Sequence, residues 1–452
     1  MRPDPDHLQR RLAEIVGSDH VTAGAARVGF TVDGVIPSLV IRPGSQEETA
    51  AVMATCAAAG AAVIPWGGGT SMGLGNPPSR ADVALVLDRL NRIVEHDAPN
   101  LTVTAEAGVR LGDLQGALRE RKQFLPLDPP AYREATLGGI LATNASGPGR
   151  LMYGTARDWV LGMRIVQPDG KPIRCGGKVI KNVSGYDMNK LFIGSLGTLG
   201  IITEATFKLL PVPAVLSIVT GAFDEIRQVK SVIAKVLDSP LLPEALELLD
   251  PDAVAFLGSR LGIGATGYGL AVALPGNPLV VERQARDFAA LFDEAEARET
   301  VTLSGERAVA SWQALTSALD LVPGAPAERI ICKIATPISR TADMLEAARH
   351  LGRSHRLQTV VLAHAGSGIV RACYLLGPDA PPAEILAGSI EDFRREAQRV
   401  EGRLILHEVP RTLKAHVDAW GKPGGDFDLM RRLKAEFDPR NLCNPGRFLG
   451  GL

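Results

Sequence analysis

Three glycine-rich segments are the parts of this sequence best suited to binding a ligand through the backbone. In the first, Gly67-Gly68-Gly69-Thr70-Ser71 follows the apolar run Ala62–Trp66. Consecutive glycines let several N–H groups point to one side and bind phosphate oxygens, and the two hydroxyls add donors. The segment fits neither GxGxxG nor GxxxxGK(S/T), so a Rossmann dinucleotide site and a P-loop are unsupported. Taken alone, it is equally consistent with a sharp turn that binds nothing.

The second segment, residues 135–147, is rich in small residues and lacks the Pro, Asp and Lys of an exposed loop. This composition suits backbone lying against a large flat ligand, with Thr136, Asn144 and Ser146 as polar contacts. The third segment covers residues 176–187 and is followed by a further glycine run at 194–203. Three such segments in one half of the chain, each after an expected strand, favour an elongated cofactor that contains phosphate.

Charge and cysteine content exclude several other classes of protein. The 452 residues include 49 Lys and Arg and 50 Asp and Glu, a net charge of −1. Such a chain has no general attraction for nucleic acid or an anionic membrane. The five cysteines are far apart and form no CxxC pair, so we expect no disulfide framework and no four-thiolate cluster, only inert buried thiols. They are Cys56, Cys175, Cys332, Cys373 and Cys443.

No membrane span is expected. The uncharged stretches 49–79 and 261–281 are interrupted by glycines and prolines, whereas a spanning helix needs about 20 strongly apolar residues. The N-terminal residues contain no apolar signal region. We therefore expect a cytoplasmic protein.

The glycine segments lie among short apolar strands and amphipathic helices, an α+β pattern. Ser45 and Glu48 form a candidate capping box that opens a helix to about Ala59, which Gly60 would end. Strands are expected at 39–41, 62–66, 83–87, 101–105, 160–166 and 200–210, and a further helix at 111–121.

A second domain is expected after Pro211-Val212-Pro213. There, a strand–helix–strand unit beginning at 215 recurs at 329–374, which suits one antiparallel sheet covered on one face by helices. A last helix is expected at 426–437. The expected division is an N-terminal domain at 1–211 with its core at 34–211, a second domain at 212–405, and a segment at 406–452 that returns to the first.

Together, the stretches PWGGGTSMG, DPPAYREATLGGILATNASGPGRLMYGTARDWVLGM and PDGKPIRCGGKVIKNVSGYDMNKLFIGSLGTLGIITEATFKLLP resemble the FAD-binding domain of the vanillyl-alcohol oxidase type. The resemblance is to the subgroup of D-lactate dehydrogenase and the FAD-linked glycolate oxidase subunits. The ending FDPRNLCNPGRF is similar to the C-terminal signature of that subgroup. The resemblance implies a two-lobed PCMH-type FAD-binding domain and a cap domain whose antiparallel sheet is covered by helices.

The resemblance also implies the residues that hold FAD. The glycine loop would bind the pyrophosphate, and the second segment would line the ribityl chain and flavin. The implied residues are Pro65, Trp66, Gly67, Gly68, Gly69, Thr70, Ser71, Pro129, Thr136, Gly138, Gly139, Asn144, Ser146, Gly147 and Ile202. Some relatives attach FAD through a histidine in this loop, where Thr70 stands here, so non-covalent FAD is expected.

Candidate catalytic residues also follow from the resemblance. Metal-dependent relatives carry an HxGDGNxH stretch, which is HAGSGIVR here, so His364 matches the first ligand and Arg371 replaces the second. The later Glu-His pair is reversed, as His407-Glu408. Because arginine stays protonated, a metal ligand at 371 is excluded and no metal is expected.

Three interpretations of this departure stay open. Arg371 could bind a substrate carboxylate while His364 or His407 acts as base; the pocket could be vestigial in an electron-relay subunit; or both histidines could be ordinary strand residues. Lys333 could bind an acid, although an exposed strand lysine is the simpler interpretation.

The favoured function is FAD-dependent oxidation of a 2-hydroxy acid such as glycolate or D-lactate, by hydride transfer to the flavin. The protein would work as a subunit of an oxidase complex with a second FAD subunit and an iron–sulfur or electron-transfer flavoprotein partner. Membrane association could then arise through those partners. The alternative function is a non-catalytic electron-relay or scaffold FAD subunit of such a complex.

Overall fold

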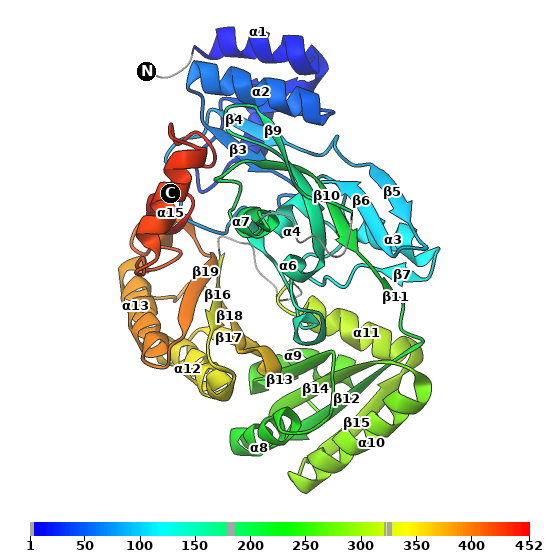
Figure 1. Ribbon diagram of the computed structural model, residues 1–452. Helices are drawn as coiled ribbons and strands as arrows, with labels where there is room; N and C mark the ends of the chain where they lie inside the picture. The colour runs from blue at the N-terminus through cyan, green and yellow to red at the C-terminus, as the bar shows by residue number, and fades with distance from the viewer. Residues whose placement is uncertain (1–3, 179–185, 321, 323–327) are drawn as a thin grey trace. The chain divides into compact units, whose positions relative to one another are not determined.

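The computed structural model describes residues 4–178, 186–320, 322 and 328–452, which form two compact units (Figure 1). Unit 1 comprises Met1–Ala145, Thr155–Val212 and Lys422–Leu452, and unit 2 comprises Ser146–Gly154 and Pro213–Gly421. After the glycine segments, the chain passes from unit 1 to unit 2 between Val212 and Pro213, beside the boundary expected at 211. The boundary expected at 405 falls inside strand β19 (Arg403–Glu408), which belongs to the sheet of unit 2.

Unit 1 contains two main sheets and a short ribbon. The first sheet has the order β1-β2-β4-β3, with β2, β4 and β3 parallel, and the second is antiparallel in the order β5-β6-β10-β8-β9. Strands β7 and β11 form the ribbon. The strands are β1 (Val21–Thr22), β2 (Leu39–Ile41), β3 (Val63–Trp66), β4 (Val83–Val86), β5 (Ile93–Asp97), β6 (Thr102–Glu106), β7 (Gln123–Phe124), β8 (Val160–Val166), β9 (Pro172–Gly176), β10 (Ile201–Lys208) and β11 (Leu210–Pro211). Strands β2 and β4 are buried along their whole length, as continuous apolar runs require.

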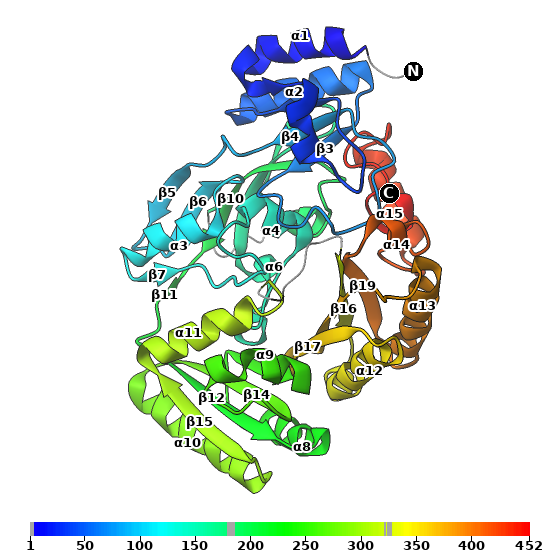
Figure 2. The ribbon, with the colours of Figure 1, turned by 180° about the vertical axis from the view of Figure 1, so that it is seen from behind.

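Helix α2 (Gln46–Ala59) shows how local sequence sets the ends of an element in unit 1. The Ser45 hydroxyl accepts a hydrogen bond from the Glu48 N–H at 3.1 Å, and Gly60 ends the helix with φ +68°. Glu48 accepts from the Gly44 N–H at 2.7 Å, one residue before the N-cap nitrogen that a capping box would use. Both predicted ends are confirmed. Helix α1 packs alongside α2, as Figure 2 shows. The helices of unit 1 are α1 (Pro5–Val16), α2, α3 (Leu111–Arg119), α4 (Leu137–Thr143), α6 (Ala156–Trp159), α7 (Asn189–Phe192) and α15 (Phe427–Phe437).

Unit 2 is built on an eight-stranded antiparallel sheet in the order β15-β12-β14-β13-β17-β18-β16-β19. The strands are β12 (Val215–Phe223), β13 (Ala245–Leu249), β14 (Tyr268–Gly276), β15 (Glu299–Ser304), β16 (Arg329–Ala335), β17 (Gln358–His364), β18 (Ile369–Leu375) and β19. The helices are α5 (Arg150–Tyr153), α8 (Ile226–Leu237), α9 (Pro251–Leu261), α10 (Pro278–Glu294), α11 (Gly305–Thr316), α12 (Thr341–Ser354), α13 (Ala383–Arg399) and α14 (Arg411–Lys414).

The repeated unit that the sequence predicts is present as two halves of this sheet. The strand order β15-β12-β14-β13 of the first half is mirrored by β19-β16-β18-β17 in the second. The second half has the βαββαβ order of a ferredoxin-like unit, and the first adds helix α9. The halves join where β13 pairs with β17.

Helices cover both faces of the sheet, so the expectation of a single covered face is wrong. Cys373 belongs to the apolar cluster that includes Val254 and Leu257 of α9 and Leu315 of α11. The next residue, Tyr374, points to the opposite face and donates to the Ala348 carbonyl of α12 at 3.0 Å. Figure 1 shows α9 and α11 across the sheet from α8 and α10.

Candidate functional site

The glycine loop of unit 1 presents free backbone donors. It follows β3, and the N–H groups of residues 68–71 donate no hydrogen bond to any other described part of the chain. Gly68, Thr70 and Ser71 are exposed, and Gly69 has φ +77°, a conformation that a residue with a side chain rarely adopts. Consecutive free N–H groups form an anion-binding nest, which fits the pyrophosphate of FAD.

Packing behind the loop explains why glycine is needed there. A Cβ at Gly67 would press into the Thr136 hydroxyl, and one at Gly68 would press into the Glu134 carbonyl oxygen. Thr136 is the N-cap of α4, where its hydroxyl accepts from the Gly139 N–H at 3.3 Å. The loop therefore lies directly against the start of α4, and we call Gly67–Ser71 together with Thr136, Gly138 and Gly139 the glycine cradle.

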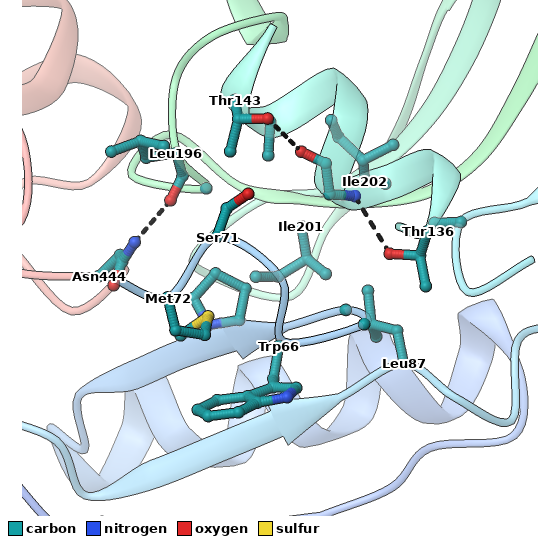
Figure 3. A pocket seen from close by; sticks show the side chains of 18 of the residues that line it. Trp66, Ser71, Met72, Leu87, Thr136, Thr143, Leu196, Ile201, Ile202 and Asn444 are labelled. Atoms are coloured by element: carbon teal, nitrogen blue, oxygen red, sulfur yellow. Dashed lines mark hydrogen bonds between the residues drawn. The ribbon is translucent and has the colours of Figure 1, made fainter. Parts of the chain in front are cut away.

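A pocket of about 90 Å³, partly open to solvent, adjoins the glycine cradle (Figure 3). Of the predicted cofactor residues, those that line it are Pro65, Trp66, Gly67, Gly68, Gly69, Thr70, Ser71, Thr136, Gly138, Gly139 and Ile202. Gly200 and Ile201, which precede Ile202 in the strand expected at 200–210, line it as well. The additional lining residues are Met72, Leu87, Ala107, Ala142, Thr143, Leu196, Gly197, Asn444 and Arg447. A pocket lined by free backbone donors and apolar side chains suits a cofactor that contains phosphate.

Two of these additional residues come from the C-terminal signature. Asn444 donates from its amide to the Leu196 carbonyl at 2.6 Å, as Figure 3 shows. Arg447 is 3% exposed; it donates to the carbonyls of Met72 (2.8 Å) and Leu74 (2.6 Å) and pairs with Asp33 at 3.1 Å. Arg447 therefore fixes the loop that continues from the cradle.

Four predicted cofactor residues are not among those that line the pocket. Pro129 is buried in the loop before α4. Asn144 ends α4 with φ +49°, and its buried Oδ1 has no partner within the described residues. Ser146 and Gly147 belong to unit 2. Residues 179–185 of the third glycine segment lie outside the described residues.

The register of the cap sheet brings the candidate catalytic residues of unit 2 together. Arg371 on β18 lies opposite Lys333 on β16, and His364 on β17 lies opposite Glu247 on β13. Arg371 also pairs with Leu362, two residues before His364, so all four side chains lie on one face of the sheet. We call Glu247, Lys333, His364 and Arg371 the charged face.

His364 and Glu247 form a buried pair. The imidazole Nδ1 lies 2.9 Å and 2.8 Å from the two carboxylate oxygens, and the residues are 6% and 1% exposed. Burial raises the pKa of Glu247, while His364 and Arg371 oppose that shift. The buried Nε2 of His364 has no hydrogen-bond partner among the described residues.

Lys333 and Arg371 are half-buried cations with no hydrogen bond or ion pair to another described residue. The nearby carboxylate of Glu408 is engaged by Arg329, at 2.6 Å and 3.0 Å. Burial, then Arg150 and Arg371, lower the pKa of Lys333 to about 8. Lys333 is thus not the exposed strand lysine that was the simpler expectation.

The third candidate, His407, lies on β19 beside an irregularity in its pairing with β16. Burial, followed by Lys333 and Arg371, places the pKa of His407 well below its usual value. His407 is therefore neutral at physiological pH, and it is close enough to both cations to respond to their charges.

Glu247 was missed by sequence reasoning, although a signal was present. It is the lone charged residue of the strand Ala245-Leu246-Glu247-Leu248-Leu249, all five of which are buried. A buried carboxylate requires a partner, but the sequence does not say that this partner is 117 residues away.

Other expectations concern metals, thiols and membranes. Within the described ranges, no three His, Cys, Asp or Glu side chains are grouped as a metal site would require. All five cysteines are buried and unpaired, and burial raises the pKa of Cys56 and of Cys332 to about 12. No helix among the described residues is long and apolar enough to cross a membrane.

Comparisons with known proteins agree with this geometry. Residues 37–176 match the FAD binding domain family, and residues 212–448 match the C-terminal domain of FAD linked oxidases. The chain is 29% identical to the glycolate oxidase subunit GlcD of Bacillus subtilis, over 97% of this chain and 96% of that protein. It is 28% identical to the D-lactate dehydrogenase of Archaeoglobus fulgidus, over 90% of each.

The fold is shared with solved structures at lower identity. A p-cresol methylhydroxylase with substrate bound superimposes with a TM-score of 0.76 at 17% identity, covering 98% of this chain and 96% of that one. The predicted α+β fold of the PCMH type is thereby confirmed. The C-terminal oxidase family alone spans more than half of the chain, so this protein belongs to the FAD-linked oxidases and is an FAD-dependent oxidoreductase of the glycolate oxidase and D-lactate dehydrogenase type.

Proposed function

We propose that this protein oxidises a 2-hydroxy acid to the corresponding 2-oxo acid. The observation that carries the proposal is the charged face, where Lys333 and Arg371, which form no hydrogen bond or ion pair with a described residue, share one face of the sheet with an imidazole whose Nε2 is unpartnered. An isolated cation or a buried polar nitrogen is costly unless a ligand satisfies it. A 2-hydroxy acid supplies both complements, a carboxylate for the cations and a hydroxyl for the imidazole.

Each group of the charged face has a defined task in this proposal. The guanidinium of Arg371 binds the carboxylate through two parallel N–H donors, and the ammonium of Lys333 adds a third charge-assisted contact. Nε2 of His364 accepts the hydroxyl proton as the C2–H bond breaks, so the alcohol becomes a ketone. The glycine cradle would hold FAD non-covalently, and the bound flavin would supply the two-electron oxidant that this reaction needs.

The relatives support this choice of substrate class, since one is named for glycolate and another for D-lactate. The first is also named as a subunit. We extend the proposal accordingly: this chain passes its electrons to a partner within an oxidase complex, a second FAD subunit with an iron–sulfur or electron-transfer flavoprotein partner.

An anaerobic titration of the purified protein tests the proposal. Glycolate, each lactate and 2-hydroxyglutarate are added in turn while the visible flavin absorption is followed, with dithionite as the control reductant. Bleaching by one acid supports catalysis by this chain and identifies its substrate. If dithionite bleaches the flavin and no acid does, the proposal fails, and an electron-relay subunit becomes the function to test by isolating the native complex.

A further inference from the structure

The Glu247–His364 pair lies at the seam where the two halves of the cap sheet join. β13 and β17 are the inner strands of the two halves, and the two residues are direct cross-strand partners. Directly opposed side chains have Cβ atoms only about 5 Å apart, so the register itself sets the contact. His364 is the last residue of β17, and the turn Ala365–Ser367 follows it. The contact with Glu247 therefore fixes the ring of His364, whereas the residues that follow His364 leave the strand.

The contact fixes which nitrogen of His364 carries a hydrogen. Nδ1 is within 2.9 Å of both carboxylate oxygens, and a carboxylate only accepts hydrogen bonds. Nδ1 is then the donor, so in the neutral ring Nε2 carries a lone pair. This nitrogen is buried and has no partner in the part of the chain that the structure describes. Nε2 can therefore accept a hydrogen bond from a ligand.

The surroundings argue against a purely structural pair. A buried imidazole needs a partner for each of its nitrogens, and the register supplies one for Nδ1 alone. Lys333 and Arg371 of the same face form no hydrogen bond or ion pair with a described residue, although the charges of Asp320 and Glu247 act on Arg371. An unpartnered nitrogen and two cations with free N–H donors on one face of one sheet suit a ligand that carries both an anion and a hydroxyl donor.

We propose that Glu247 is the positioning residue that makes His364 a proton acceptor for the substrate hydroxyl. This inference rests on the proposed function and deepens it. In the step, the substrate O–H bond breaks and its proton goes to Nε2, while the C2–H bond breaks and the hydrogen leaves with its electron pair as hydride, for which bound FAD would be the acceptor. The C2–O bond becomes a carbonyl, and the positive charge gained by His364 is balanced by the Glu247 carboxylate beside it.

The decisive variant is Glu247→Gln, which keeps the size of the side chain and changes its hydrogen bonding. A glutamine amide can donate to Nδ1, which would move the ring hydrogen to Nε2 and remove the acceptor. We expect the limiting rate of flavin reduction to fall ~100-fold or more, by analogy with other carboxylate–imidazole pairs. The substrate dissociation constant should change little, because Arg371 and Lys333 still bind the carboxylate.

Two further variants separate positioning from a general loss of structure. Glu247→Asp retains a carboxylate and should recover part of the lost rate. Glu299→Gln is the matched control: Glu299 is a half-buried carboxylate on β15 of the same sheet, where it accepts from the Gly264 N–H at 2.9 Å. It should reduce flavin at the wild-type rate.

A spectroscopic measurement tests the pair without any turnover. Labelling with ¹⁵N-histidine gives signals from all eight histidines of the chain. The signals of His364 are those that are missing from the spectrum of His364→Asn. Wild type should show hydrogen on Nδ1, and Glu247→Gln should show it on Nε2. Hydrogen on Nε2 in the neutral wild-type ring, or wild-type flavin reduction by Glu247→Gln, would overturn the inference. If no 2-hydroxy acid reduces the wild-type flavin, the proposed function fails, and the ¹⁵N spectrum still decides whether Glu247 sets the tautomer.

Discussion

The glycine cradle and the charged face are built by different means. The cradle uses backbone: free N–H groups of residues 68–71, and glycines whose missing side chains let the loop approach α4. The charged face uses side chains from four strands, and their meeting depends on sheet register. Binding at the cradle therefore depends on the space left by the missing side chains, whereas binding at the charged face depends on charge and hydrogen bonding.

This difference separates the effects of mutations. A change that fills the cradle should remove the cofactor, whereas a change on the charged face should leave the cofactor bound and alter only the handling of substrate. Four changes, from the largest expected effect to the smallest, can contradict this separation.

The largest effect is expected from Gly68→Ala. The added Cβ would press into the Glu134 carbonyl oxygen, which is backbone and cannot swing aside, so the loop and its free N–H groups must move. The purified variant should contain almost no FAD by absorbance. Gly116→Ala in α3 is the control, because no atom lies within 4 Å of its added Cβ. Full flavin content in Gly68→Ala would show that the loop does not bind the cofactor as proposed.

A smaller effect, about 3–5 kcal/mol in the free energy of unfolding, is expected from Arg447→Met. The substitution breaks the 3.1 Å pair with Asp33 and removes the bonds to the Met72 and Leu74 carbonyls. Urea unfolding followed by flavin release measures the loss. Arg431→Met, at a residue whose side chain is 66% exposed, should change stability by no more than about 0.5 kcal/mol. Equal stability of the two variants would mean that Arg447 does not support the cradle.

The cradle was predictable because it requires a particular residue type, glycine, at particular positions. Three consecutive glycines after an apolar strand predict either a phosphate-binding loop or a sharp turn. Eleven of the predicted cofactor residues line the pocket. Asn444 and Arg447 were not predicted as part of it. Their position beside the pocket depends on the pairing of Cys443 with Val63. These two residues are far apart in the sequence, so no local pattern encodes the contact.

The charged face was predictable only in part. Of its four members, His364 and Arg371 were identified from their place in a family motif. The unit expected at 329–374 contains both, but β19, which carries the third candidate His407, was not predicted as a strand. Glu247 was missed, and Lys333 was judged an exposed lysine. Both errors have one cause: a side chain's environment depends on which strands become neighbours, and the order β13-β17-β18-β16 cannot be derived from strand patterns alone.

A ~100-fold rise in KM is expected from Arg371→Ala, since losing charge-assisted hydrogen bonds to a carboxylate costs about 1.5–3 kcal/mol. The FAD content should stay at the wild-type level, because the change is confined to the charged face. Anaerobic flavin reduction at several substrate concentrations provides both values. Unchanged substrate kinetics would remove Arg371 from the mechanism, and a loss of FAD would contradict the separation between the two sites.

The smallest effect is a pH dependence that should originate at Lys333. Its pKa is lowered to about 8, so the ammonium is charged below that pH and loses its proton above it. Substrate binding should therefore weaken by up to ~10-fold as the pH rises from 7 to 9.5, the loss of one charge-assisted contact. Lys333→Arg keeps a positive charge at all these pH values and should abolish the rise in KM, while Lys333→Met should show the weak binding already at pH 7. If the rise persists in Lys333→Arg, the titrating group lies elsewhere and Arg371 is left to bind the carboxylate without Lys333.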